Sequence, residues 1–117
     1  MKKENLILEK SFDFALSVVS LYQQMVANKE YVLSKQLLRS GTSIGANIEE
    51  ATAAISRKDF IAKMSIASKE ARETRYWLML LQRSQIVKLD FTICINEINQ
   101  IINILTAIVK TTQGNVE

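Results

Sequence analysis

Proline is absent from this chain of 117 residues, and glycine occurs only three times. These two residues are the strongest local breakers of regular structure, so a chain that nearly lacks them has few turns. Sandwiches and barrels need a breaker between each pair of short strands, which this chain does not supply. The sequence therefore predicts a small number of long helices with short connections.

Composition excludes several classes of protein. Apolar residues make up 48% of the chain and charged residues 23%, near the average for a globular protein, so the chain is not broadly disordered. Histidine is absent, which excludes imidazole bases, His-containing triads and His-ligated metals. The single cysteine allows neither an internal disulfide nor a cysteine zinc site. We expect one domain over residues 1–117, with no catalytic residues, metal or cofactor.

The charge and the apolar runs bear on location and partners. The formal net charge is +3, which is compatible with an anionic partner. The apolar run at residues 6–8 is interrupted at once by Glu9 and Lys10, unlike a signal peptide. No uninterrupted apolar stretch approaches the roughly 18 residues that a membrane span needs. We therefore expect a cytoplasmic protein that does not contact a membrane.

Four segments repeat apolar residues at helical spacing, over about residues 4–27, 31–53, 57–83 and 90–112. Ser56 and Asp90 are the expected N-caps of the third and fourth segments. Short breaks between helices of similar length predict an all-α, antiparallel up-down-up-down four-helix bundle. Gly41 and Gly45 lie inside the second segment, where each costs about 1 kcal/mol relative to alanine. They indicate a close helix approach or a local bend.

The apolar side of the fourth segment spans about 200° of the helix, roughly double what one bundle face needs. A monomer with such a helix would leave an apolar strip in water. We therefore expect a homo-oligomer whose contact involves the fourth helix and part of the first; the alternative is a monomer with an apolar surface. The predicted contact residues are Ile93, Ile101, Ile104 and Ile108.

Polar side chains line one flank of the second and third segments. The structural interpretation is a half-buried network in which Arg39 pairs with Glu50 or Glu73. The catalytic interpretation is general acid–base catalysis by a pair of glutamates, but neither a nucleophile nor a set of metal ligands accompanies them. We favour the structural interpretation. The residues of this predicted network are Arg39, Ser43, Asn47, Glu50 and Glu73, with Glu70 and Trp77 beside them.

Basic residues recur on the predicted outer side of the third segment, within an arc that holds no acid. Such an arc is suited to successive phosphates of RNA or DNA, and a tyrosine within it is available for base stacking. The alternative is an ordinary solvated helix face. The candidate nucleic-acid-binding residues are Lys58, Lys69, Arg72, Tyr76 and Arg83, and Ser65 lies among them.

Two stretches carry a resemblance to a known family. Residues 36–51 read QLLRSGTSIGANIEEA, and residues 68–78, which follow Asp59-Phe60, read SKEARETRYWL. The first stretch resembles the pattern Q-L-x-R-S-x-x-S-I-x-A-N-I-x-E-[GA] of bacterial four-helix-bundle proteins encoded in intervening sequences of 23S ribosomal RNA genes. Gly45 stands where that family usually has proline, and Ala51 where it often has glycine.

The resemblance implies a homopentameric ring of bundles, but it implies little about function. A related branch, the accessory variability proteins of diversity-generating retroelements, forms similar pentamers that bind nucleic acid and a reverse transcriptase. Members of that branch are typically more basic than this chain. Three interpretations remain open: an RNA- or DNA-binding protein, a protein-interaction adaptor or scaffold without nucleic-acid contact, and a retroelement accessory protein.

Overall fold

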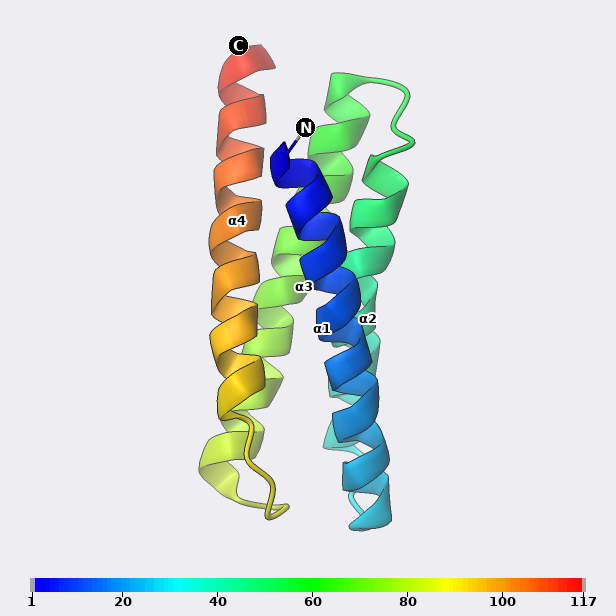
Figure 1. Cartoon of the computed structure of the whole chain (residues 1–117), viewed down its shortest axis with the longest axis vertical. Coiled ribbons are helices and arrows are strands. Elements are labelled where there is room, and N and C mark those ends of the chain that lie inside the picture. The colour runs from blue at the N-terminus through cyan, green and yellow to red at the C-terminus, as the bar shows by residue number, and fades with distance from the viewer. Residues whose placement is uncertain (1, 117) are drawn as a thin grey trace.

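The computed structural model describes residues 2–116, and the surroundings of the side chains within residues 5–114. It contains α1 (Lys2–Ala27), α2 (Leu33–Ala51), α3 (Arg57–Ser84) and α4 (Thr92–Val116) (Figure 1). Successive helices run in opposite directions, and the molecule is a rod of 48 × 21 × 21 Å. The described residues contain no strand. The prediction of an all-α four-helix bundle is confirmed.

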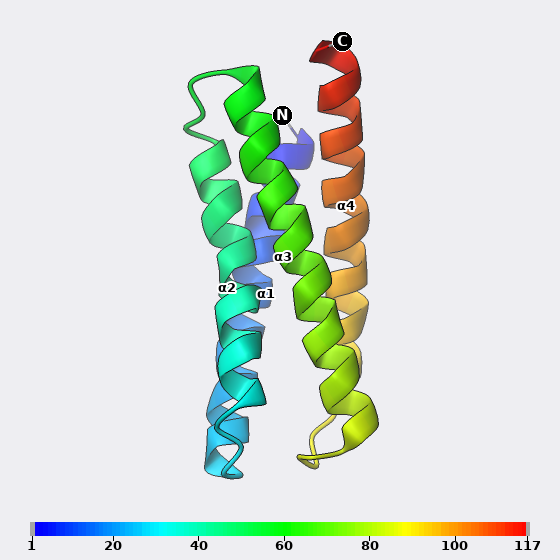
Figure 2. The ribbon, with the colours of Figure 1, turned by 180° about the vertical axis from the view of Figure 1, so that it is seen from behind.

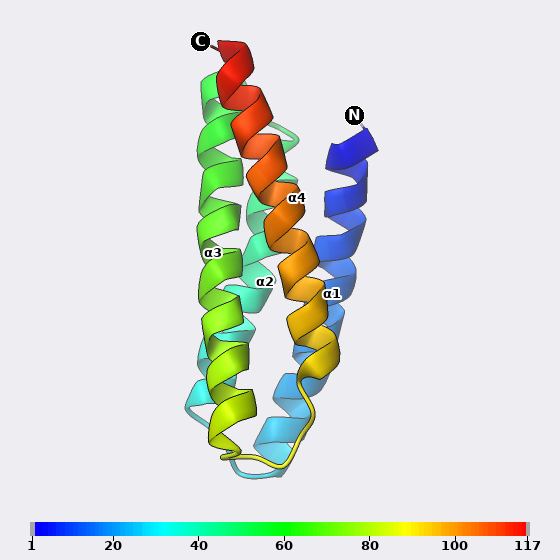
Figure 3. The same cartoon turned by 90° about the vertical axis from the view of Figure 1, so that its left-hand side faces the viewer.

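The helices pack in a ring, because each contacts its neighbours in the chain and α4 also packs against α1. Within the described residues α1 does not pack against α3, nor α2 against α4, so these pairs lie diagonally across the bundle (Figure 3). Large apolar side chains from all four helices fill the space between them. The fully buried ones include Phe14, Met25, Leu37, Ile44, Met64, Leu78, Leu81 and Ile98.

Glu30 fixes the start of α2, a role that the sequence did not reveal. Its carboxylate accepts hydrogen bonds from the backbone N–H groups of Val32, Leu33 and Ser34 at 3.2, 3.1 and 2.6 Å. The Ser34 hydroxyl donates to the Glu30 carbonyl oxygen at 2.7 Å. Burial opposes the negative charge, but the hydrogen bonds outweigh burial and lower the pKa of Glu30. The first turn of α2 therefore depends on an ionised carboxylate that lies before the helix.

The starts of α3 and α4 lie close to the predicted caps. Ser56 Oγ accepts the backbone N–H of Asp59 at 3.0 Å, as an N-cap does. The Asp59 carboxylate faces the backbone N–H of Ile55, at 3.4 Å. Asp90 Oδ1 accepts the backbone N–H of Thr92 at 3.0 Å and its hydroxyl at 2.6 Å, which lowers the pKa of Asp90. Helix α4 therefore begins at Thr92, two residues later than expected.

The glycines of α2 mark a close approach to α1. A Cβ atom built on Gly41 would lie 2.9 Å from Val18 Cγ2, whereas one built on Gly45 would lie 3.4 Å from Ser11 Oγ. Real side chains do not tolerate the first distance, and the second is an ordinary contact. The interpretation of a close helix approach therefore holds at Gly41.

Helix α4 is covered more completely than the sequence suggested. Ile101 and Ile108 are only 1% and 3% exposed, because α1 and α3 cover α4 from two sides. Ile104 is half-buried against the core, while Ile93 is 74% exposed. Two of the four predicted contact residues, Ile101 and Ile108, therefore belong to the core of a single chain. Residues 92–114 are also long and apolar enough to cross a membrane, but in this bundle their apolar side packs against other helices.

Candidate functional site

The outer side of α3 carries what we call the α3 basic stripe: Lys58, Lys69, Arg72 and Arg83, together with Tyr76. All five side chains are exposed, and their helical spacing places them on one side of α3, away from the core. The ribbon of α3 lies in front of α1 in Figure 2. Among the described residues, the ion pairs of the structure involve other cations. The stripe therefore presents cations outside these ion pairs to solvent, and of its members Lys69 also acts through space on the Glu73 carboxylate.

The two glutamates of α3, Glu70 and Glu73, lie on another side of the helix, facing α2. Arg39 of α2 binds both glutamates, with Nη1 at 3.2 Å from Glu70 Oε1 and Nη2 on Glu73 Oε2. Ser43 Oγ donates to Glu70 Oε1 at 3.0 Å, and Trp77 Nε1 donates to Glu73 Oε2 at 3.0 Å. The bonds from Trp77 and Arg39 lower the pKa of Glu73. A carboxylate held ionised in this way favours a structural role over proton transfer.

The remaining residues of the predicted network lie apart from Arg39. Asn47 Nδ2 donates to the backbone carbonyl of Ser43 at 2.8 Å, within its own helix. Glu50 pairs instead with Lys63, whose Nζ lies 2.7 Å from Glu50 Oε1, and the Glu50 side chain is 59% exposed. The polar flank therefore consists of two separate ion-pair groups on the α2–α3 surface.

A buried hydrogen bond, which the sequence reading missed, also joins α2 and α3. Thr74 Oγ1 donates to Ser40 Oγ at 2.9 Å, and both residues are fully buried. Thr74 occupies a seam position that is otherwise apolar, and a buried hydroxyl needs a partner. This requirement could have predicted a hydrogen bond at Thr74 from the sequence, but it would not have identified Ser40 as the partner.

Helix α1 exposes three large apolar side chains on one side, which we call the α1 outer row. Phe12, Leu16 and Val19 are 66%, 57% and 39% exposed. Their spacing of four and three residues aligns them on one side of the helix, away from the buried Phe14 and Val18. A row of this kind is the pattern by which one helix packs against another.

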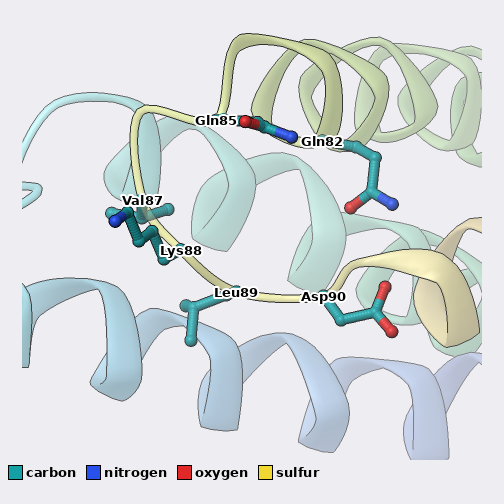
Figure 4. A pocket seen from close by; sticks show the side chains of 6 residues that line it. All are labelled: Gln82, Gln85, Val87, Lys88, Leu89 and Asp90. Carbon is teal, nitrogen blue, oxygen red and sulfur yellow. The ribbon is translucent and has the colours of Figure 1, made fainter.

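A hollow of about 310 Å³ lies at the turn between α3 and α4 (Figure 4). Gln82 lines it, but its side chain already holds the turn together. Its Oε1 accepts the backbone N–H of Phe91 at 2.9 Å, and its Nε2 donates to Thr92 Oγ1 at 3.2 Å. The hollow is therefore explained by the turn that positions the start of α4. Its lining residues are Gln82, Gln85, Val87, Lys88, Leu89 and Asp90.

Comparison with known proteins agrees with the motif in residues 36–51. Residues 3–107 match the model of a family described as 23S rRNA-intervening sequence protein. A crystal structure of a protein with unknown function, from the S23 ribosomal protein family of Bacteroides thetaiotaomicron, is 50% identical with a TM-score of 0.87. The match covers 92% of this chain and 98% of that one. No curated protein matches the chain. The resemblance is confirmed, and the chain belongs to the 23S rRNA-intervening sequence protein family.

Proposed function

We propose that this protein binds the sugar–phosphate backbone of nucleic acid through the α3 basic stripe and performs no catalysis. The observation that carries this proposal is the separation of charge on α3. Its outward cations face solvent together, while Glu70 and Glu73 are bound to Arg39 on the α2 side. A phosphate chain laid along the stripe therefore meets cations without meeting carboxylates.

The proposal has a quantitative consequence for salt dependence. Each phosphate contact to a single strand contributes about −0.7 to the slope of log affinity against log salt. Contacts from the four cations of the stripe give a slope of about −3, so affinity falls about 50-fold between 50 and 200 mM salt. Phosphates carry no sequence information, so affinity is nearly independent of base sequence.

Fluorescence anisotropy with a labelled 15-nucleotide single strand tests this function. We expect the double variant Lys69→Glu/Arg72→Glu to bind weakly and to show a flatter salt dependence, while circular dichroism shows an intact bundle. The control variant, Lys35→Glu/Lys88→Glu, makes the same charge change at exposed positions outside α3. Unchanged binding by the α3 variant would place the site on another surface. No binding by the wild-type protein at low salt would favour the adaptor interpretation.

We also propose that the protein forms a homo-oligomer and that the α1 outer row is part of the contact between copies. Three large apolar side chains on one helix face favour burial against another helix. Of the α4 residues suggested by the sequence, Ile101 and Ile108 are already buried within one chain, whereas Ile93 is 74% exposed and stays available for a contact. The family resemblance suggests a pentameric ring as the form of the assembly.

Light scattering after size-exclusion chromatography tests the assembly. The pentamer has about five times the 13.3 kDa mass of one chain. We expect Leu16→Glu to yield smaller species, because a carboxylate in an apolar contact is costly to bury. Gln24→Glu, at an exposed polar position on another side of α1, is the matched control and leaves the mass unchanged. A monomeric wild-type protein at micromolar concentration would refute the proposal.

A further inference from the structure

The outward side of α4 carries uncharged polar side chains beside the α3 basic stripe. Asn96, Asn99, Asn103 and Thr106 follow one another at spacings of three and four residues and are exposed or half-buried. We call them the α4 polar row. Arg72 Nη2 lies 3.4 Å from Thr106 Oγ1. The row and the stripe therefore border one another on one side of the bundle, the α3–α4 face (Figure 3).

A second contact strengthens this arrangement and adds a cation. Arg75 Nη1 of α3 lies 3.4 Å from Asn99 Oδ1, so Arg75 belongs to the same face. The one acid of α4 within residues 92–114, Glu97, points instead toward α1, where it lines a small hollow with Lys10 and Asp13. The middle of the α3–α4 face thus combines cations with amides and a hydroxyl. The carboxylates of Glu70, Glu73 and Glu97 lie on other sides of α3 and α4.

The two halves of this face offer different hydrogen-bonding chemistry. Lysine and arginine only donate, which matches phosphate oxygens that only accept. The carboxamides and hydroxyl of the α4 polar row both donate and accept. A ribose 2′-hydroxyl also does both, and it distinguishes RNA from DNA. Tyr76, 60% exposed beside the stripe, offers a ring on which an unpaired base can stack.

We propose that the α3–α4 face binds single-stranded RNA in preference to DNA, with phosphates on the α3 basic stripe and ribose 2′-hydroxyls on the α4 polar row. This inference rests on the proposed nucleic-acid binding and specifies its ligand. The α4 contacts involve neutral groups, so they displace no counterions. They contribute to affinity without changing the salt slope, whereas the α3 contacts determine that slope.

Anisotropy with three 15-mers of one mixed sequence tests the inference: RNA, its DNA equivalent with deoxyuridine, and 2′-O-methyl RNA. We expect the wild-type protein to bind RNA about threefold to tenfold more tightly than the other two, the range that one or two net hydrogen bonds give. Asn96→Ala/Asn103→Ala should bring RNA affinity close to that for DNA at an unchanged salt slope. Gln23→Ala/Gln36→Ala removes two exposed amides from α1 and α2 and serves as the control.

The outcomes separate this inference from the function on which it rests. Equal affinity for RNA and DNA, or an RNA preference that survives in the α4 double variant, refutes the role of the α4 polar row. In either case the salt-dependent binding by α3 still stands. If none of the three strands binds at low salt, the proposed function fails and the inference fails with it.

Discussion

The two glycines inside α2 should respond in opposite directions to the same substitution. Alanine in place of glycine within a helix contributes about 1 kcal/mol of stability. At Gly45 the added Cβ lies 3.4 Å from Ser11 Oγ, an ordinary contact, so Gly45→Ala should gain most of that amount. At Gly41 the added Cβ lies 2.9 and 3.0 Å from the two Cγ atoms of Val18. Overpacking costs about 1–3 kcal/mol, so Gly41→Ala should destabilise the bundle by about 1 kcal/mol net.

Val18 gives the structure little freedom to relieve this clash. Its side chain is fully buried, and a valine in a helix has one strongly preferred rotamer. Urea unfolding measures the prediction, and a difference of 1 kcal/mol corresponds to about 4 °C in Tm for a chain of this length. In the double variant Gly41→Ala/Val18→Ala the new methyl group occupies space left by the valine. Its stability should therefore exceed the sum of the two single effects by about 1 kcal/mol. Equal stabilisation by Gly41→Ala and Gly45→Ala would show that the helices separate there at no cost.

Three further predictions follow from named contacts. Glu30→Gln should cost about 1 kcal/mol at neutral pH. Because the folded pKa of Glu30 is lowered from the ordinary 4.5, this difference is fully present above 4.5. It should vanish in urea melts as the pH falls through the lowered folded pKa. Arg39→Ala should lower the free energy of unfolding by about 1 kcal/mol, less than the loss of a buried ion pair, because the Arg39 side chain is 51% exposed. An unchanged urea midpoint together with altered RNA binding would show that Arg39 has a functional role and not a structural one. Leu16→Glu should weaken RNA binding at least tenfold through lost multivalency, with an unchanged RNA-to-DNA ratio in anisotropy.

The sequence predicted those features that depend on periodicity. Helical spacing of apolar residues determines which side of each helix is buried, so the four helices and the exposed side of α3 followed from pattern alone. The Ser56 cap was also predictable, because a serine just before an apolar repeat has a local partner three residues on. Glu30 was missed because its carboxylate caps α2 from three residues before the helix, just after the turn at which Lys29 is left-handed.

The sequence-based predictions that failed concern contacts that depend on how the helices are tilted and offset against one another. The width of the apolar side of α4 suggested a surface for a second copy, but α1 and α3 together cover Ile101 and Ile108. Arg39 and Glu50 lie on one face of α2, which suggested a pair, but eleven residues of helix separate them by about 16 Å along the axis. In the structure Arg39 therefore pairs with Glu73 of α3, and Glu50 pairs with Lys63. Spacing gives the side of a helix, whereas the tilt and offset between helices decide the partner.

The positions of the two proposed surfaces make assembly and RNA binding compatible. Helix α1 lies diagonally across the bundle from α3, and the α1 outer row points away from the core and therefore away from α3. A contact through that row leaves the α3 basic stripe open to solvent, so every copy in an assembly presents its own α3–α4 face. Contacts that are weak in one copy then act together on one strand, because binding at the first face raises the local concentration of RNA at the next. Charge also favours contact between copies through α1 and RNA binding through α3. The side chains of the α1 outer row are neutral and do not repel a neighbouring copy, whereas the cations of α3 repel one another less when they lie far apart on the outside of the assembly.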